Sequence, residues 1–152
     1  MEPQIVKKPA LSLVGLKLHG KLEGMDLMAL WNIFGPRMAE IKDGDPRVCY
    51  GAMDNYNEAT GEFDYLAACA AKNTSALPAD MISWAVPAQT YAVFPCTLPQ
   101  VGEAWMTAYQ QWLPQSGYKR AAGPEFELYD EKFNPQDPAA TLYLYVPIVS
   151  AN

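Results

Sequence analysis

The feature that most constrains the fold is an internal repeat in the order of the predicted elements. In each half, an alternating apolar segment precedes a segment with helical periodicity, and two further alternating segments follow, separated by a polar turn. The halves span approximately residues 1–72 and 81–152, with the polar linker 73–80 between them. This order predicts a single α+β domain over 1–152, built from duplicated βαββ units related by a pseudo-twofold axis, with both helices on one side of the sheet.

Two segments have the apolar spacing of amphipathic helices, residues 25–41 and 99–113. Gly35-Pro36 predicts a kink or a break in the first. Pro114 is expected to end the second near Leu113, and Gly117 is suited to the left-handed turn that follows. Trp105 and Trp112 lie on the apolar stripe of the second helix, so core packing is the favoured interpretation for both.

The remaining apolar segments alternate as strands do. The first is expected to be interrupted near Pro9 and to carry a bulge at Val14-Gly15, where the alternation slips by one residue. The predicted strands are 4–18, 47–53, 62–71, 82–95 with a turn at 87–89, 125–129 and 141–149.

The strand 125–129 carries the one chemically suggestive pattern. Phe126 and Leu128 share one face, whereas Glu125, Glu127 and Tyr129 share the other. A carboxylate in apolar surroundings loses hydration, so its pKa should rise unless a cation or hydrogen-bond donors offset that loss. Glu127 is therefore the candidate anchor of a ligand site, while Glu125, nearer the turn, is expected to be solvated.

Charge and composition exclude several classes of protein. The net charge of −6 and the pI near 4.7 argue against a nucleic-acid-binding surface. The cysteines Cys49, Cys69 and Cys96, together with the single histidine His19, match no metal-binding spacing, so we expect free thiols, no metal and no cofactor. Neither a signal peptide nor a membrane span is present in the sequence, which favours a cytoplasmic location without membrane contact.

Several motifs resemble one known family. They are Val14-Gly15 at the first strand, Tyr50-Gly51, the run 61–65 (GEFDY), the run 86–94 (VPAQTYAVF), the run 112–118 (WLPQSGY) and the run 124–129 (PEFELY). Over nearly its whole length the chain resembles the GyrI-like small-molecule-binding domain, which is also the effector-binding domain of AraC- and MerR-type bacterial transcription regulators. Because no helix-turn-helix segment precedes these motifs, a stand-alone protein without direct nucleic-acid contact is expected.

The resemblance implies an antiparallel duplicated βαββ fold with a central cleft roofed by aromatic residues. It places the acid at the Glu127 position in that cleft, facing a small organic molecule that is often lipophilic, aromatic and cationic. Members of the family include multidrug sensors, proteins linked to gyrase inhibition and hydrolases of cyclopropane-bearing toxins. The expected ligand-binding residues are Glu127, Tyr65, Tyr91, Trp105, Tyr129 and Tyr145.

Three function classes remain open on the sequence. A binding protein would pair Glu127 with a lipophilic cation. A hydrolase would use Glu127 as a general acid or base, assisted by the Tyr65 hydroxyl. A protein-binding inhibitor would present an acidic cluster to a basic partner, and the nearest such cluster is Asp54, Glu58, Glu62 and Asp64. In a purely structural role, Glu127 would hydrogen-bond a neighbouring tyrosine.

Overall fold

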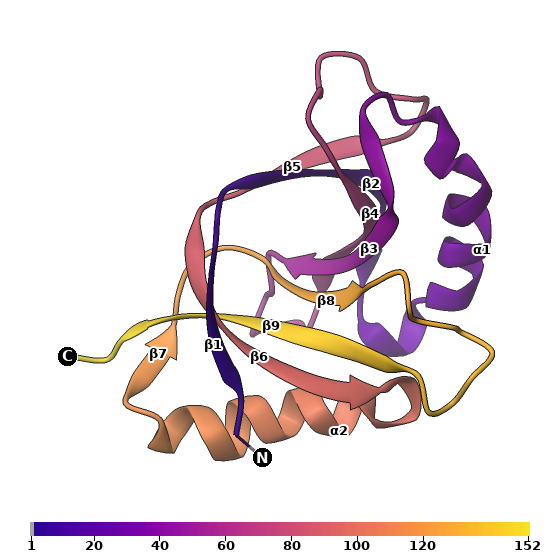
Figure 1. Ribbon diagram of the computed structural model, residues 1–152. Coiled ribbons are helices and arrows are strands. Elements are labelled where there is room, and N and C mark those ends of the chain that lie inside the picture. Colours follow the sequence, from indigo (N-terminus) through magenta and orange to yellow (C-terminus); the bar gives the residue numbers. More distant parts are fainter. Residues whose placement is uncertain (1) are drawn as a thin grey trace.

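A nine-stranded antiparallel sheet forms the centre of the computed structural model, which describes residues 2–152 (Figure 1). The strands are β1 (Gln4–Lys8), β2 (Leu11–Gly20), β3 (Gly44–Asp54), β4 (Phe63–Ala71), β5 (Ile82–Val86), β6 (Gln89–Thr97), β7 (Tyr118–Arg120), β8 (Glu125–Tyr129) and β9 (Thr141–Ser150). Their order in the sheet is β1-β6-β9-β8-β3-β4-β2-β5, and β7 pairs with β9.

The strand order confirms the duplicated βαββ arrangement. The central neighbours are β3 from the first half and β8 from the second. The strand order is equivalent on the two sides of this central pair. Beyond β8 lie β9 and then β6, and beyond β3 lie β4 and then β2. The outermost strands are exchanged between the halves, because β1 pairs with β6 and β5 pairs with β2. Each exchanged strand is joined to its own half through a proline, Pro9 or Pro87, which cannot donate a ladder hydrogen bond.

This exchange makes the sheet curl. Since only Pro9 and Ala10 separate β1 from β2, the two ends of the sheet are held together, and Figure 1 shows the strands curling around the inner face. Both helices pack on the outer face (Figure 1). The helix α1 (Leu27–Arg37) covers β2, β3 and β4, and α2 (Val101–Met106) with its continuation covers β6 and β9.

The first helix is shorter than the predicted 25–41. The Asp26 side chain caps its start by accepting a hydrogen bond from the Ala29 N–H at 3.0 Å. The helix runs through Pro36 and ends one residue later, and a 3₁₀ turn over Met38–Glu40 follows. The break expected at Gly35-Pro36 is therefore a helix end.

The second helical segment changes its hydrogen-bonding pattern along its length. A 3₁₀ turn over Leu98–Gln100 leads into α2, a wider π-helical stretch spans Thr107–Trp112, and a second 3₁₀ turn spans Leu113–Gln115. As predicted, Gly117 takes the left-handed conformation, with a φ of 79°. π-helical turns of this kind are frequently found at functional sites.

The bulge predicted at Val14-Gly15 is wrong, because β2 pairs with β4 and β5 in continuous register. Leu13 packs on the inner face, while Val14 and Leu16 pack under α1. The slip in the apolar pattern arises because both faces of this strand are buried. Gly15 serves close packing, since a Cβ there would lie 1.8 Å from the Ala67 carbonyl oxygen.

Candidate ligand-binding site

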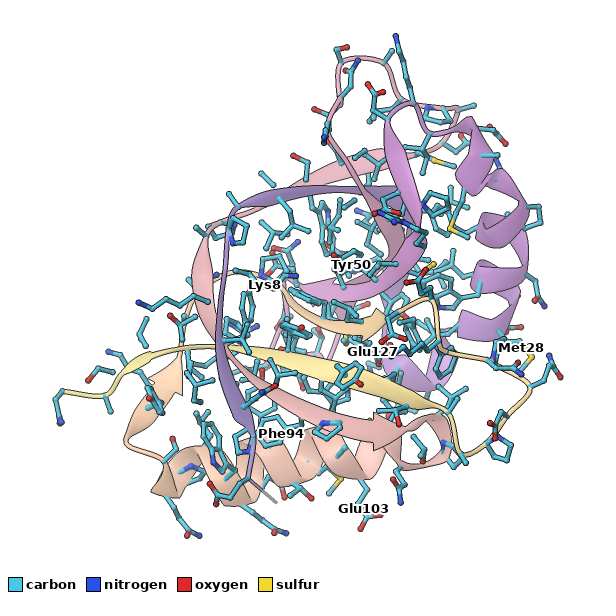
Figure 2. All side chains as sticks on the ribbon, viewed as in Figure 1. Lys8, Met28, Tyr50, Phe94, Glu103 and Glu127 are labelled. Atoms are coloured by element: carbon cyan, nitrogen blue, oxygen red, sulfur yellow. The ribbon has the colours of Figure 1, made fainter. Side chains whose placement is uncertain are left out.

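The Glu127 carboxylate lies at the junction of the two halves, on the outer face of the central strand β8 (Figure 2). Glu127 is only 8% exposed. The predicted alternation is confirmed, because Phe126 and Leu128 belong to the inner-face core. A side chain from α2 reaches the acid directly, and a side chain from α1 contacts the tyrosines that donate to it.

Three neutral donors hold the carboxylate. The Tyr129 hydroxyl donates to Glu127 Oε1 at 2.8 Å, and the Tyr65 hydroxyl donates to the same oxygen at 3.2 Å. The Trp105 indole N–H donates to Oε2 at 3.4 Å, the longest contact of the three. These donors come from β8, β4 and α2, so four of the six expected ligand-binding residues do converge.

Two further residues, Trp31 and Gly51, complete the site. The Trp31 indole N–H of α1 donates to the Tyr65 hydroxyl at 3.1 Å, and its ring meets that of Tyr129 edge to face at 5.8 Å. Trp31 lies in the segment 25–41, whose apolar spacing predicts a helix. A general rule could have pointed to Trp31, because a buried indole N–H needs a hydrogen-bond acceptor.

Gly51 is the second of these residues. It pairs with Glu127 across β3 and β8, and a Cβ at this position would lie 2.2 Å from the Tyr65 hydroxyl oxygen and 2.7 Å from Glu127 Oε1. The absence of a side chain at Gly51 therefore creates the space in which the tyrosine and the acid meet.

The electrostatics of the site are unbalanced. Burial raises the pKa of Glu127, although the hydrogen bonds from Tyr129, Trp105 and Tyr65 act in the opposite direction. Burial, together with the neighbouring carboxylate, also raises the pKa of Tyr65 and Tyr129, so both hydroxyls stay protonated as donors. Within residues 2–152, no lysine, arginine or histidine nitrogen lies within 4.0 Å of the carboxylate. The negative charge has donors but no counter-ion.

Glu125, two residues earlier on the same face, is in the opposite situation. The Arg120 guanidinium donates to Glu125 Oε1 at 3.0 Å, as does the Tyr109 hydroxyl. The expectation that Glu125 is solvated is therefore wrong, since it is paired within the protein. The Trp105 and Tyr109 ring centroids lie 6.1 Å apart in a stacked arrangement. These residues are four positions apart on one face of the helical segment, and they contact Glu127 and Glu125 respectively, which are two positions apart on one face of β8.

The structure does not bring Tyr91 and Tyr145 to the acid. Both pack in the inner-face core with Phe126, with ring centroids 5.3 Å and 4.8 Å from it respectively. Alternation along β6 and β9 turns these side chains away from the helices.

The rings of Trp31, Trp105 and Tyr129 lie around Glu127, where the resemblance implied a cleft roofed by aromatic residues. Two hollows lie elsewhere on the surface, and Glu127 lines neither of them. One of about 400 Å³ lies beside Trp112 and Tyr118, and one of about 680 Å³ lies at the rim near Leu11 and Val86.

The remaining candidate groups from the sequence are His19, the acidic cluster around Asp64 and the three cysteines. His19 Nδ1 lies 2.7 Å from Asp64 Oδ1, and Asn55 donates to the other Asp64 oxygen, so part of the acidic cluster is already engaged. All three cysteines are free. Within the described 2–152, no group of three or more His, Cys, Asp or Glu side chains has the arrangement of a metal site. The same range contains no helix long and apolar enough to cross a membrane.

Comparison with known protein families identifies a small-molecule-binding domain. The chain belongs to the GyrI-like small molecule binding domain family, which matches residues 1–149. Among curated proteins, it is 38% identical to the transcriptional regulator BrlR of Pseudomonas aeruginosa over 152 residues, covering 97% of this chain and 56% of the regulator. The chain thus spans about half the length of that relative.

Solved structures share the fold at low sequence identity. SAV2435 bound to tetraphenylphosphonium has a TM-score of 0.75 at 18% identity, covering 98% of this chain and 94% of that one. The EcmrR C-terminal domain has a TM-score of 0.75 at 15% identity, covering 99% and 98% of the two chains. These likenesses confirm the expected fold.

Proposed function

We propose that this domain binds a lipophilic organic cation, with Glu127 as its anionic anchor, and that it serves to sense or sequester such compounds. The observation that carries the proposal is the buried carboxylate with three neutral donors and, in the described part of the chain, no cationic partner. An organic cation supplies the missing charge without needing to displace all the donors.

The aromatic surroundings suit the same ligand class. Trp31, Trp105 and Tyr129 present rings around the acid, and a delocalised cation is attracted to such faces as well as to the carboxylate. Trp105 makes the longest hydrogen bond to Glu127, so its displacement costs least. We infer that the ligand enters by replacing the Trp105 contact, next to the π-helical stretch Thr107–Trp112.

The relatives support this proposal. A structural neighbour is described bound to tetraphenylphosphonium, a lipophilic cation, and the sequence relative is a transcriptional regulator. The acidic net charge favours a domain that receives the ligand and does not itself contact DNA. A cytoplasmic location is part of the proposal, and the three free thiols are consistent with a reducing compartment.

The test compares ions of matched shape and opposite charge. We expect tetraphenylphosphonium to raise the melting temperature of the wild type by mass action and tetraphenylborate to leave it unchanged. Glu127→Gln keeps the shape of the side chain and removes its charge, so the phosphonium shift should be lost. Glu125→Gln is the matched control, because Glu125 already has Arg120 and should not contribute. Equal phosphonium binding by Glu127→Gln and wild type would refute the proposal.

The second candidate is hydrolysis of an electrophilic, cyclopropane-type compound. It is favoured by one observation, the raised pKa of Glu127 beside the Tyr65 hydroxyl at 3.2 Å, which suits a general acid. Turnover that vanishes in Glu127→Gln, without saturable phosphonium binding by the wild type, would favour this candidate over the first. A protein-binding role stays a prediction, tested by retention of a basic partner by wild type and Glu127→Gln alike.

A further inference from the structure

The inner face of the sheet carries a second group of polar side chains that the Glu127 site does not use. The group consists of Lys8 on β1, Tyr91 on β6 and Tyr145 on β9, which all point away from the helices. Figure 2 shows Lys8 in the region of Tyr50, another inner-face residue, and away from Glu127. Nothing in the Glu127 site explains their arrangement.

Tyr91 has a hydroxyl without a partner. The residue is 0% exposed, and its hydroxyl oxygen is the one buried side-chain polar atom in residues 2–152 without a hydrogen bond. A buried unpaired donor destabilises a protein, so such groups are rare. Burial raises the pKa of Tyr91 to about 12, so the hydroxyl is a donor that lacks an acceptor.

Lys8 has a charge without a partner. Its Nζ lies 5.4 Å from the centre of the Tyr145 ring, and no carboxylate in the described chain lies within 4.0 Å of it. Desolvation alone lowers the pKa of this ammonium, in contrast to Arg120, which has Glu125 beside it. The cation is held over an aromatic ring with no anion to neutralise it.

The two unpartnered donors meet at one ring. Tyr91 and Tyr145 lie edge to face at 5.5 Å, so the hydroxyl-bearing ring and the Lys8 ammonium both adjoin Tyr145. Lys8 and Tyr145 are partly exposed, whereas Tyr91 is 0% exposed, so solvent reaches this group at Lys8 and Tyr145. An ammonium and a hydroxyl donor beside an aromatic ring match a ligand that combines a carboxylate with a flat ring.

We propose that Lys8, Tyr91 and Tyr145 form a second binding site, on the inner face, for a small aromatic carboxylate. The carboxylate accepts from Lys8 and Tyr91, and its ring packs against Tyr145. This site has the opposite charge preference to the Glu127 site and is separated from it by the sheet. It does not depend on the function proposed above.

The experiment uses 2-naphthoate as the probe and 2-naphthamide as its neutral counterpart, measured by isothermal titration calorimetry. Lys8→Met should weaken naphthoate binding about tenfold or more, as expected for one charge-assisted hydrogen bond. Lys7→Met is the matched control, because the neighbouring lysine is exposed and alternates to the other face.

Two further readouts separate binding from folding. Tyr91→Phe removes an unpaired hydroxyl, so its melting temperature should equal or exceed that of the wild type while its naphthoate affinity falls. In the unmutated protein, bound naphthoate should raise the pKa of Lys8, followed by the NMR signal of its ε-carbon. Failure of the wild type to bind naphthoate at millimolar concentration, or equal binding by Lys8→Met and Lys7→Met, would overturn the proposal.

Discussion

Replacing Gly51 by alanine tests the packing that creates the Glu127 site. The added Cβ would lie 2.2 Å from the Tyr65 hydroxyl oxygen, 2.7 Å from Glu127 Oε1 and 2.9 Å from Tyr65 Cζ. These separations are far below contact distance, so the tyrosine must move and its hydrogen bond to the acid must break.

The magnitude follows from two terms. Overpacking a filled core costs about 1–3 kcal/mol. Loss of a hydrogen bond to a charged group costs a further 1.5–3 kcal/mol, roughly. We expect Gly51→Ala to lower the free energy of unfolding by about 3 kcal/mol or more, measured by urea denaturation monitored by tryptophan fluorescence.

A double-mutant cycle with Tyr65→Phe identifies the cause. Phenylalanine lacks the hydroxyl that the new Cβ would meet, so the cost of Gly51→Ala should be smaller in that background by at least about 1 kcal/mol. The control is Gly102→Ala in α2, where a Cβ meets nothing within 4 Å. That change should be neutral or stabilise by up to about 1 kcal/mol. Additive effects of Gly51→Ala and Tyr65→Phe would refute the reasoning.

Three other predictions concern the same acid and the sheet around it. Because burial raises the native pKa of Glu127 above its usual 4.5, the native state keeps that proton longer, and wild-type stability is lost as pH rises from about 4.5 through the native pKa. The difference in free energy of unfolding between Glu127→Gln and wild type should therefore grow with pH and then level off; a flat difference in urea titrations from pH 4 to 8 would contradict this. Tyr129→Phe removes the 2.8 Å hydrogen bond to Glu127 and should raise the pKa of Glu127 further, which NMR titration of the Glu127 carboxyl carbon measures. An unchanged pKa would mean that this hydrogen bond does not favour the ionised carboxylate. Gly15→Ala should cost more than about 4 kcal/mol, since its Cβ would meet the Ala67 backbone, and a folded variant of near wild-type stability in urea would show that β2 can separate from β4.

Phosphonium binding itself should depend on pH if the proposed function holds. A cation binds the ionised carboxylate, so binding releases the proton that Glu127 retains at low pH, and affinity should increase with pH until Glu127 is ionised in the free protein. Calorimetry in two buffers of different ionisation enthalpy measures the released protons directly. No proton release at any pH would mean that the cation does not contact Glu127.

Local periodicity determined much of this protein. The alternation in residues 125–129 correctly predicted which side chains share each face of β8, and the spacing in 99–113 placed the second helical segment. These features depend on neighbours within one element, and the order of elements then defined the duplicated fold. The motifs that resemble the GyrI-like family correctly predicted its membership.

Strand register and strand exchange determined which residues from different strands and helices meet. Alternation shows which residues of one strand share a face, but it does not show which face of another strand lies on the same side of the sheet. Tyr91 and Tyr145 were grouped with Glu127 for that reason, whereas the pairing of β6, β9 and β8 turns them to the inner face. The contacts of Trp31 with Tyr65 and of Arg120 with Glu125 likewise required the folded chain. Residues far apart in sequence meet only after the sheet has curled, so the closed, aromatic-covered form of the Glu127 site is a property of the tertiary structure.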